Sequence, residues 1–137
     1  MKYYILLPSV SFVGSSIDNR QWENVLRSVS AYRSYRWLNE HEISPRGICN
    51  FLILDPRFPR SLIFCARQLA VNLRLLAKEY NQKSKSAKLS RVISKNLDTI
   101  KVNEIFELGL HEFLRQCIAD LSQLSAQIEN DFGFYPS

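Results

Sequence analysis

The amino-acid sequence predicts an all-α protein, built as an antiparallel bundle of about five helices. Three observations favour this class. Apolar residues recur at intervals of three and four over several long segments, the spacing that places them on one face of a helix. No two strand-like runs are separated by turn residues that would let them pair. The connections between the periodic segments are short, and short connections favour antiparallel neighbours.

Length and composition fit a single globular domain over residues 1–137. Of the 137 residues, 46% are hydrophobic and 23% are charged, and the chain holds only four Gly and five Pro. These values exclude the disordered, collagen-like and disulfide-scaffold classes. The net charge of +5 permits acidic partners but does not require nucleic acid.

The first helix expected from the pattern covers residues 18–38. A connection precedes it, because residues 8–17 contain a Pro, a Gly and four Ser. Asp18 and Gln21 have the spacing of a capping box, which marks a helix start. Trp22 then begins a stripe of apolar residues at helical spacing.

Two more helices are expected on either side of a proline-rich corner. Ser44 followed by Pro45 is typical of a helix start, and a short helix is predicted over 45–54. The corner covers residues 55–59, where the prolines keep the preceding residues extended. From Pro59 a repeat by threes and fours predicts the longest interior helix, over about 22 residues.

The carboxy-terminal part predicts a weaker fourth helix and a long last one. Asn103 is a suitable cap for the last helix, whose apolar seam runs from Phe106 to Ile128 at intervals of 4, 3, 4, 4, 3 and 4. This seam predicts one continuous helix of about 28 residues. The apolar positions that suggest the fourth helix are Leu89, Val92, Ile93 and Leu97.

Residue chemistry gives little support for a metal or a cofactor, and we expect neither. Cys49, Cys65 and Cys117 are odd in number and far apart, and we expect buried thiols that act as small hydrophobic groups. His111 and the following Glu begin like the zinc motif H-E-x-x-H, but Arg115 stands where the second His would ligate. The four glycines are isolated, which excludes a glycine-rich nucleotide loop.

The sequence favours a cytoplasmic protein. Pro8 interrupts the apolar start of the chain, and no run of about 18 apolar residues occurs, so neither export nor a membrane span is expected. The basic stretch from Lys78 to Lys95 is expected to be a solvated surface, with nucleic-acid binding as the less favoured alternative.

Three ordered blocks of residues carry a resemblance that covers nearly the whole chain. The first block contains Gln21-Trp22, Leu26-Arg27-Ser28-Val29-Ser30-Ala31-Tyr32 and Tyr35-Arg36. The second contains Ile43-Ser44-Pro45, Phe51-Leu52-Ile53-Leu54-Asp55, Phe58-Pro59-Arg60-Ser61 and Cys65. The third contains Glu104-Ile105-Phe106 and Gly109-Leu110-His111-Glu112-Phe113-Leu114. In this order and at these separations they resemble the bacterial alpha-E domain family.

The resemblance implies an all-helical domain whose family is named for a Glu-Arg signature in an amino-terminal helix. That helix would precede the stretch resembling Lys2-Tyr3-Tyr4, and this sequence contains no Glu-Arg dipeptide. We therefore expect a chain that lacks the first helix of the bundle, through either a late start or a shortened copy. Loss of that helix would leave the Phe106 to Ile128 seam partly uncovered, and self-association is then possible.

Genes of this family typically lie beside ATP-grasp-type peptide ligases and transglutaminase-like cysteine proteases. The resemblance thus implies a helical accessory or adaptor domain that acts with the ligase in forming peptide or amide bonds. An enzyme component of the same system and a weak nucleic-acid-binding domain are the alternatives. Tyr35, Arg36, Arg60 and His111 are the candidate partner contacts, because they offer planar hydrogen bonding or stacking. Structural roles for them are the competing interpretation.

Overall fold

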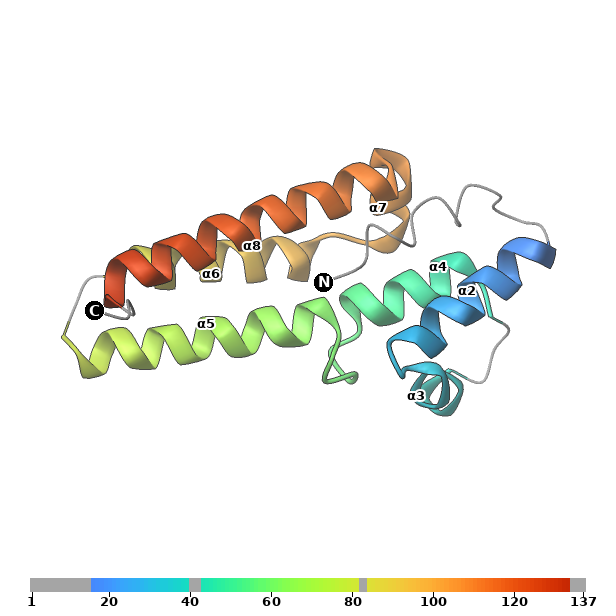
Figure 1. Cartoon of the computed structure of the whole chain (residues 1–137), viewed down its shortest axis with the longest axis horizontal. Coiled ribbons are helices and arrows are strands. Elements are labelled where there is room, and N and C mark those ends of the chain that lie inside the picture. The colour runs from blue at the N-terminus through green and yellow to red at the C-terminus, as the bar shows by residue number, and fades with distance from the viewer. Residues whose placement is uncertain (1–15, 40–42, 82–83, 134–137) are drawn as a thin grey trace.

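The computed structural model describes residues 16–39, 43–81 and 84–133, and every regular element within these ranges is helical (Figure 1). The prediction of an all-α fold is confirmed. The expected connection before residue 16 and the apolar start of the chain lie outside the described residues. The elements are α2 (Ser16–Ser28), α3 (Tyr32–Leu38), α4 (Pro45–Cys49), the π-helix η2 (Asn50–Leu54), α5 (Leu62–Glu79), α6 (Lys85–Thr99), α7 (Val102–Leu108) and α8 (Leu110–Phe132).

The three longest helices of the carboxy-terminal part form an up-down-up layer. Helix α6 runs antiparallel to both α5 and α8 and packs against both of them (Figure 1). Asp131, near the end of α8, accepts hydrogen bonds from the Ser86 amide at 2.7 Å and from the Ser84 hydroxyl at 3.1 Å. These bonds place a carboxylate at the amino-terminus of α6, where the helix dipole favours negative charge.

The helix predicted over 18–38 is divided into two, and it begins at Ser16 rather than at Asp18. Ser30 takes the left-handed conformation with φ of 56°. The Ser30 amide donates to the Arg27 carbonyl at 3.1 Å, and the Ala31 amide donates to the Leu26 carbonyl at 2.8 Å. This pattern is a Schellman motif with Ser in the position usually held by Gly. The apolar periodicity continues across the motif. For this reason, the spacing of apolar residues does not reveal that the helix ends there.

The helix predicted over 45–54 and the following corner are confirmed. The Ser44 hydroxyl caps α4 by accepting from the Gly47 amide at 3.0 Å, and the last turn widens into η2. The next helix begins at Leu62, three residues after Pro59, because the Ser61 hydroxyl caps it by accepting from the Phe64 amide at 3.2 Å. Hydroxyl side chains thus fix both helix starts.

The prediction of one continuous last helix from Asn103 is wrong. Gly109 has φ of 98° and ψ of 119°, a conformation outside the helical region, and it separates α7 from α8. Asn103 lies inside α7 and does not cap it; its Oδ1 accepts from Arg46 Nη1 at 2.7 Å. The same guanidinium lies 4.8 Å from the centre of the Phe106 ring. Both contacts hold α7 against α4.

Helix α6 is predicted correctly, but its buried face differs from the expected one. Three serines spaced by four residues, Ser86, Ser90 and Ser94, are buried with Leu97, whereas Val92 is 52% exposed. Serine side chains are small, so α5 and α8 can approach α6 closely. Apolar periodicity alone cannot identify such a face.

The main core lies in the amino-terminal half, where three aromatic rings pack together. The Phe51 ring lies edge-on to Tyr35 with 5.3 Å between ring centres, and it stacks on Phe58 at 4.5 Å. Such pairs contribute about 0.5–1.5 kcal/mol beyond the area they bury. The buried residues that surround these rings include Trp22, Val25, Leu26, Ala31, Ile48, Ile53, Ile63 and Ile105.

Candidate interaction surfaces

Tyr35 anchors α3 to the rest of the fold. Its side chain is 2% exposed, and its hydroxyl lies so close to α4 that a Cβ atom at Gly47 would be 2.6 Å from it. Only glycine leaves room for this approach. Burial raises the pKa of Tyr35, and hydrogen bonding with Ser44 opposes part of that rise. The structure therefore places Tyr35 in the core, where it attaches α3 to the rest of the fold and does not face the solvent.

Arg60 braces the turn that leads into α3. Its Nη2 donates to the Ser30 carbonyl at 2.9 Å, and its guanidinium lies 5.5 Å from the centre of the Phe58 ring. The arginine therefore links the corner before α5 to the left-handed residue of the α2–α3 turn. The structure thus connects Arg60 to the turn before α3, the helix that contains Tyr35 and Arg36.

Helix α3 presents a cationic and aromatic surface to the solvent. Arg33, Arg36 and Trp37 are all exposed, and Trp37 reaches 86% exposure. Arg33 and Arg36 make no ion pair or side-chain hydrogen bond with another described residue. Trp37 was not among the residues singled out from the sequence. Its position two residues after Tyr35, away from the apolar stripe, is the signal that could have identified it.

His111 lies apart from this group. It is exposed on the first turn of α8, next to Leu110, which lines an apolar pocket. Of the four candidate contacts, the structure therefore leaves two on the surface without bracing interactions, Arg36 and His111. The structure gives no test of partner binding by any of the four, which stays a prediction.

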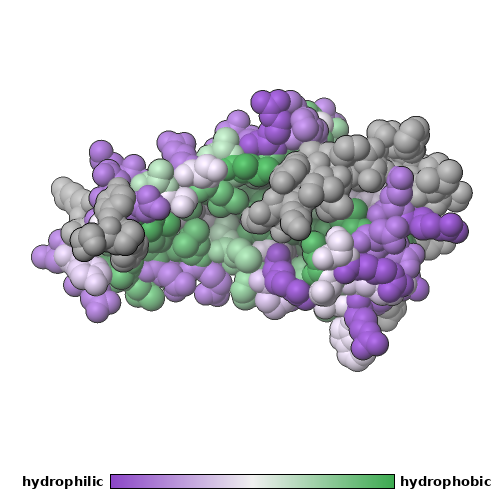
Figure 2. All heavy atoms as spheres, viewed as in Figure 1, coloured by the Kyte–Doolittle hydropathy of each residue, from purple (hydrophilic) through white to green (hydrophobic). Residues whose placement is uncertain are grey.

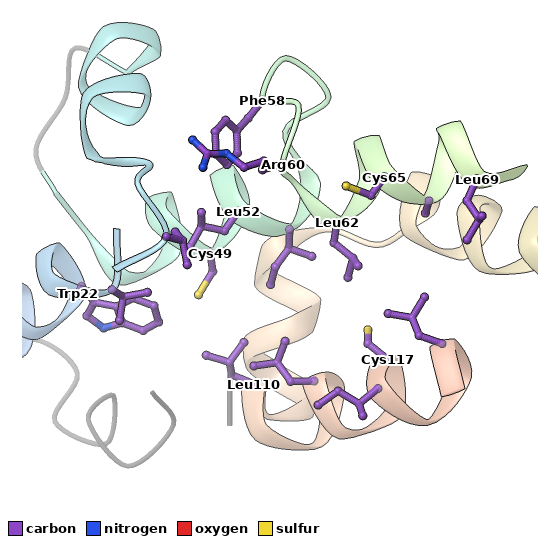
Figure 3. Close-up of a pocket in the computed structure, with 17 residues that line it drawn as sticks. Trp22, Cys49, Leu52, Phe58, Arg60, Leu62, Cys65, Leu69, Leu110 and Cys117 are labelled. Carbon is purple, nitrogen blue, oxygen red and sulfur yellow. The ribbon is translucent and has the colours of Figure 1, made fainter. Parts of the chain in front are cut away.

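An apolar pocket of about 430 Å³ lies between α5 and α8 and extends to α2 and η2. Hydrophobic side chains gather along this side of the molecule, with hydrophilic ones flanking them (Figure 2). Arg60 is the one charged residue among the described residues that line the pocket, and it stands beside Phe58 at an edge (Figure 3). Lining residues of α5 and α8 include Leu62, Cys65, Ala66, Leu69, Leu110, Leu114, Cys117, Ile118 and Leu121.

All three cysteines line this pocket, two of them on α5 and α8 and one at the end of α4 (Figure 3). Burial raises the pKa of Cys49 to about 12. Burial, together with the nearby Asp120 carboxylate, raises the pKa of Cys117 to about 11. A thiol with a raised pKa is protonated at neutral pH and is a poor nucleophile. The expectation of buried thiols holds for Cys49, whereas Cys117 is only partly buried and Cys65 is exposed.

The described residues contain no group of three or more His, Cys, Asp or Glu side chains placed to hold a metal ion. Within the same ranges, no helix combines the length and the apolar character needed to cross a membrane. The described basic side chains of the stretch from Lys78 to Lys95 face the solvent, and Lys88, Arg91 and Lys95 are exposed on α6. Lys83 lies outside the described residues.

The fold and these surfaces define a class of protein, a small helical domain that exposes an apolar pocket and a cationic aromatic helix. The chain belongs to the Alpha-E family, described as a predicted alpha-helical domain with a conserved ER motif, whose profile matches residues 1–132. The Glu-Arg dipeptide does not occur in this sequence. No match was found among curated proteins, and none was found among solved structures.

Proposed function

We propose that this domain is a non-catalytic adaptor that acts with an ATP-grasp-type ligase in peptide or amide-bond formation, in the cytoplasm of a bacterial cell. A transglutaminase-like protease is the second partner that we propose for the system. The observation that supports an adaptor role is the apolar pocket between α5 and α8. Exposed apolar surface of this kind is typical of a site where another protein packs.

The shape of the pocket suits an added helix. Helices α5 and α8 both pack on α6, and side chains of both line the pocket. An amphipathic helix that buries its apolar face there would complete a bundle of four helices. We assign this helix to the ligase.

The chemistry of the pocket supports binding over catalysis. The described residues that line it are apolar apart from Arg60, and the guanidinium of Arg60 already donates a hydrogen bond to the Ser30 carbonyl. Two of the thiols in it, Cys49 and Cys117, have raised pKa values. General acid–base or nucleophilic catalysis needs a group whose pKa is suited to the working pH. The pocket is better suited to bury side chains of a partner.

An affinity pull-down from the native host tests the proposal. Ile118 lines the pocket and is 41% exposed. Ile118→Glu therefore places a charge in the proposed interface at a position where the fold tolerates a polar side chain. Val92→Glu on α6 is the matched control, because Val92 is exposed and does not line the pocket. We expect wild type and Val92→Glu to recover the ligase, and Ile118→Glu to recover at least about tenfold less. Far-UV circular dichroism of the three proteins shows whether the fold is kept.

The other outcomes separate the two parts of the proposal. Recovery of no ligase by wild type, or of a second copy of this chain alone, overturns the ligase partnership. Equal recovery by both variants keeps the partnership and overturns the pocket as its site. His111→Ala is expected to weaken ligase binding while the fold stays intact, because His111 is one of the candidate partner contacts. Lost turnover with retained binding would instead favour an enzyme.

A further inference from the structure

A strip of positive charge lies along one face of the α5–α6 pair. The two helices run antiparallel (Figure 1), and Arg67 Nε on α5 donates to Asp98 Oδ1 on α6 at 3.0 Å. This ion pair shows which sides of the two helices meet. Arg74 lies seven residues after Arg67, and Arg91 lies seven residues before Asp98, which is about two helical turns in each case. The antiparallel arrangement therefore places Arg74 opposite Arg91.

Three lysines extend this strip along the same face. Lys78 follows Arg74 by four residues, and Lys88 and Lys95 lie three residues before and four residues after Arg91. Residues at these intervals are neighbours on a helix surface. All five cations are exposed, and none forms an ion pair with another described residue. We name these five residues the basic strip.

The acidic side chains of α5 and α6 do not neutralise the basic strip. Asp98 is already paired with an arginine. Glu79 lies about 100–140° around α5 from the two cations of that helix, so it faces another direction. Asp131 of α8 approaches α6 from its buried side, where it accepts a hydrogen bond from the amide of Ser86.

The acidic residues outside the described ranges are also far from the basic strip in the fold. Residues 82–83, between α5 and α6, are Gln and Lys, and residues 1–15 and 134–137 contain neither Asp nor Glu. Glu40 and Glu42 belong to the link from α3 to α4. These two helices lie beyond the amino-terminal end of α5, whereas the basic strip lies toward its carboxy-terminal end (Figure 1). The opposite charge must therefore come from another molecule.

Exposed aliphatic side chains border the basic strip on α5. Val71 and Leu75 are 41% and 55% exposed, and neither lines the apolar pocket. They lie three residues before and one residue after Arg74. Leu69 does line the pocket, and it lies about 140° around α5 from Arg74. The basic strip and its two aliphatic neighbours thus form a face that is separate from the pocket.

We propose that this face docks an amphipathic acidic helix of a partner protein. The cations of α6 repeat at intervals of three and four residues, and Val71 and Leu75 are four residues apart. A facing helix with the same intervals carries Asp and Glu along one side and Leu or Val along the adjacent side. The carboxylates pair with the basic strip, and the aliphatic side chains cover Val71 and Leu75. The inference does not depend on which protein occupies the apolar pocket.

A nucleic acid fits this face less well. Its phosphates would pair with the basic strip, but its backbone offers no aliphatic group to cover Val71 and Leu75. Single-stranded nucleic acids are bound largely by stacking of bases on aromatic side chains. Helix α6 has no aromatic residue, and α5 has only Phe64, ten residues before Arg74.

Binding of a labelled peptide to the full chain tests the proposal. The probe is a synthetic helical peptide with Glu at intervals of three and four residues on one side and Leu at the same intervals on the adjacent side. Its control has the same composition in an order without this period. We expect fluorescence anisotropy to show at least about fivefold tighter binding of the helical peptide. No binding of that peptide, or equal binding of both peptides, would overturn the proposal.

Charge reversal on the two helices identifies the site. Arg74→Glu combined with Arg91→Glu is expected to weaken binding of the helical peptide at least about tenfold. The control, Arg33→Glu with Arg36→Glu, makes the same change in net charge on α3, where both arginines are exposed, and should stay within about twofold. Circular dichroism shows whether the variants keep the fold. Equal weakening by the two double variants would show attraction to net charge alone and would overturn the proposal.

Two further measurements separate this face from the pocket and from a nucleic-acid site. Leu75→Ser should weaken peptide binding at least about threefold, because it removes an aliphatic contact. Ile118→Glu alters the pocket and should leave peptide binding within about twofold, so the two proposals can fail independently. Loss of binding with Ile118→Glu would place the peptide in the pocket and overturn the inference. A single-stranded oligonucleotide that binds more tightly than the peptide would also overturn it.

Discussion

The amino-terminal half closes around its apolar side chains, whereas the carboxy-terminal layer leaves many of them open. In the first region, Tyr35, Phe51 and Phe58 pack ring against ring under α2, α3 and α4. In the second, α5 and α8 border an apolar pocket, and Leu75 is exposed on α5. Both regions have the same helical periodicity in the sequence. The comparison teaches that periodicity creates an apolar face but does not determine whether another element covers it.

The largest difference between the two regions is expected in the free energy of unfolding. Phe51→Ala removes a ring that is buried between two others, and it should destabilise the protein by about 3–5 kcal/mol. Leu75→Ala in the open layer should change stability by less than about 0.5 kcal/mol, because the side chain is exposed. Urea unfolding of both variants measures the contrast. Similar losses would mean that the open layer is as well packed as the closed core.

The two regions are also expected to differ in the rates at which their thiols react. Cys65 lies exposed in the open pocket, whereas Cys49 is buried with a pKa raised to about 12. A maleimide at neutral pH should modify Cys65 at least about 100-fold faster than Cys49, because the thiolate is the reacting form. Mass spectrometry of digested samples over time gives the rates, and Cys65→Ser should remove the fast phase. Similar rates at both sites would show that the closed core opens readily.

The corner that joins the two regions is expected to be sensitive to pH. Hydrogen bonds from Arg57 lower the pKa of the buried Asp55 carboxyl, against the effect of its burial. A lowered pKa stabilises the fold above the ordinary carboxyl pKa, and this stabilisation is lost as pH falls through the folded value. Asp55→Asn should lower the free energy of unfolding by about 1–3 kcal/mol at pH 7. Between pH 5 and 3, the stability of the variant should decline less steeply than that of the wild type, because about one titrating group has been removed. Urea midpoints across this range provide the measurement.

Asp131 also contributes to the pH dependence of stability. Burial raises its pKa, but hydrogen bonds from Ser86, Gln127 and Ser84 outweigh this effect and lower it. Asp131 joins α8 to α6, so it contributes its own pH dependence within the open layer. The Asp55→Asn variant should therefore retain a residual decline. A variant with the full decline of the wild type would show that Asp55 does not stabilise the corner.

The smallest expected effect concerns the turn between α2 and α3. Ser30→Gly should stabilise the closed region by about 1 kcal/mol, because glycine adopts the left-handed conformation without the strain of a side chain. The Arg60 bond is kept, since it reaches the backbone carbonyl. Ser28→Gly, within α2, is the control and should destabilise by about 0.5 kcal/mol. Thermal unfolding of both variants tests the opposite signs.

Much of the helical content could be predicted from the sequence, and the errors have identifiable causes. The helix over 45–54 and its capping residue Ser44 follow from local chemistry, and the structure confirms both. The breaks at Ser30 and Gly109 were missed because the apolar spacing runs across them without interruption. The buried serines of α6 were missed because their burial depends on close packing with neighbouring helices.

The candidate surfaces were only partly visible in the sequence. Arg36 is a candidate partner contact from the sequence, and the structure places it on the surface of α3. Tyr35 is a candidate on the same grounds, yet its hydroxyl fits against Gly47 in the core. The pocket could not be located at all, since its lining comes from segments as distant as Trp22 and Leu121. Side-chain type indicates what a residue can do, and packing determines which of those roles is open to it.

The sequence by itself determined that this protein is helical, where several helices begin, and that it belongs among Alpha-E domains. These properties depend on the spacing of apolar residues and on side chains that form hydrogen bonds with the backbone within one or two helical turns. Only the tertiary structure decided that Trp37 is exposed, that Arg60 supports α3, and that an apolar pocket lies between α5 and α8. The physical reason is that burial depends on contacts between residues far apart in the chain, which no local pattern specifies.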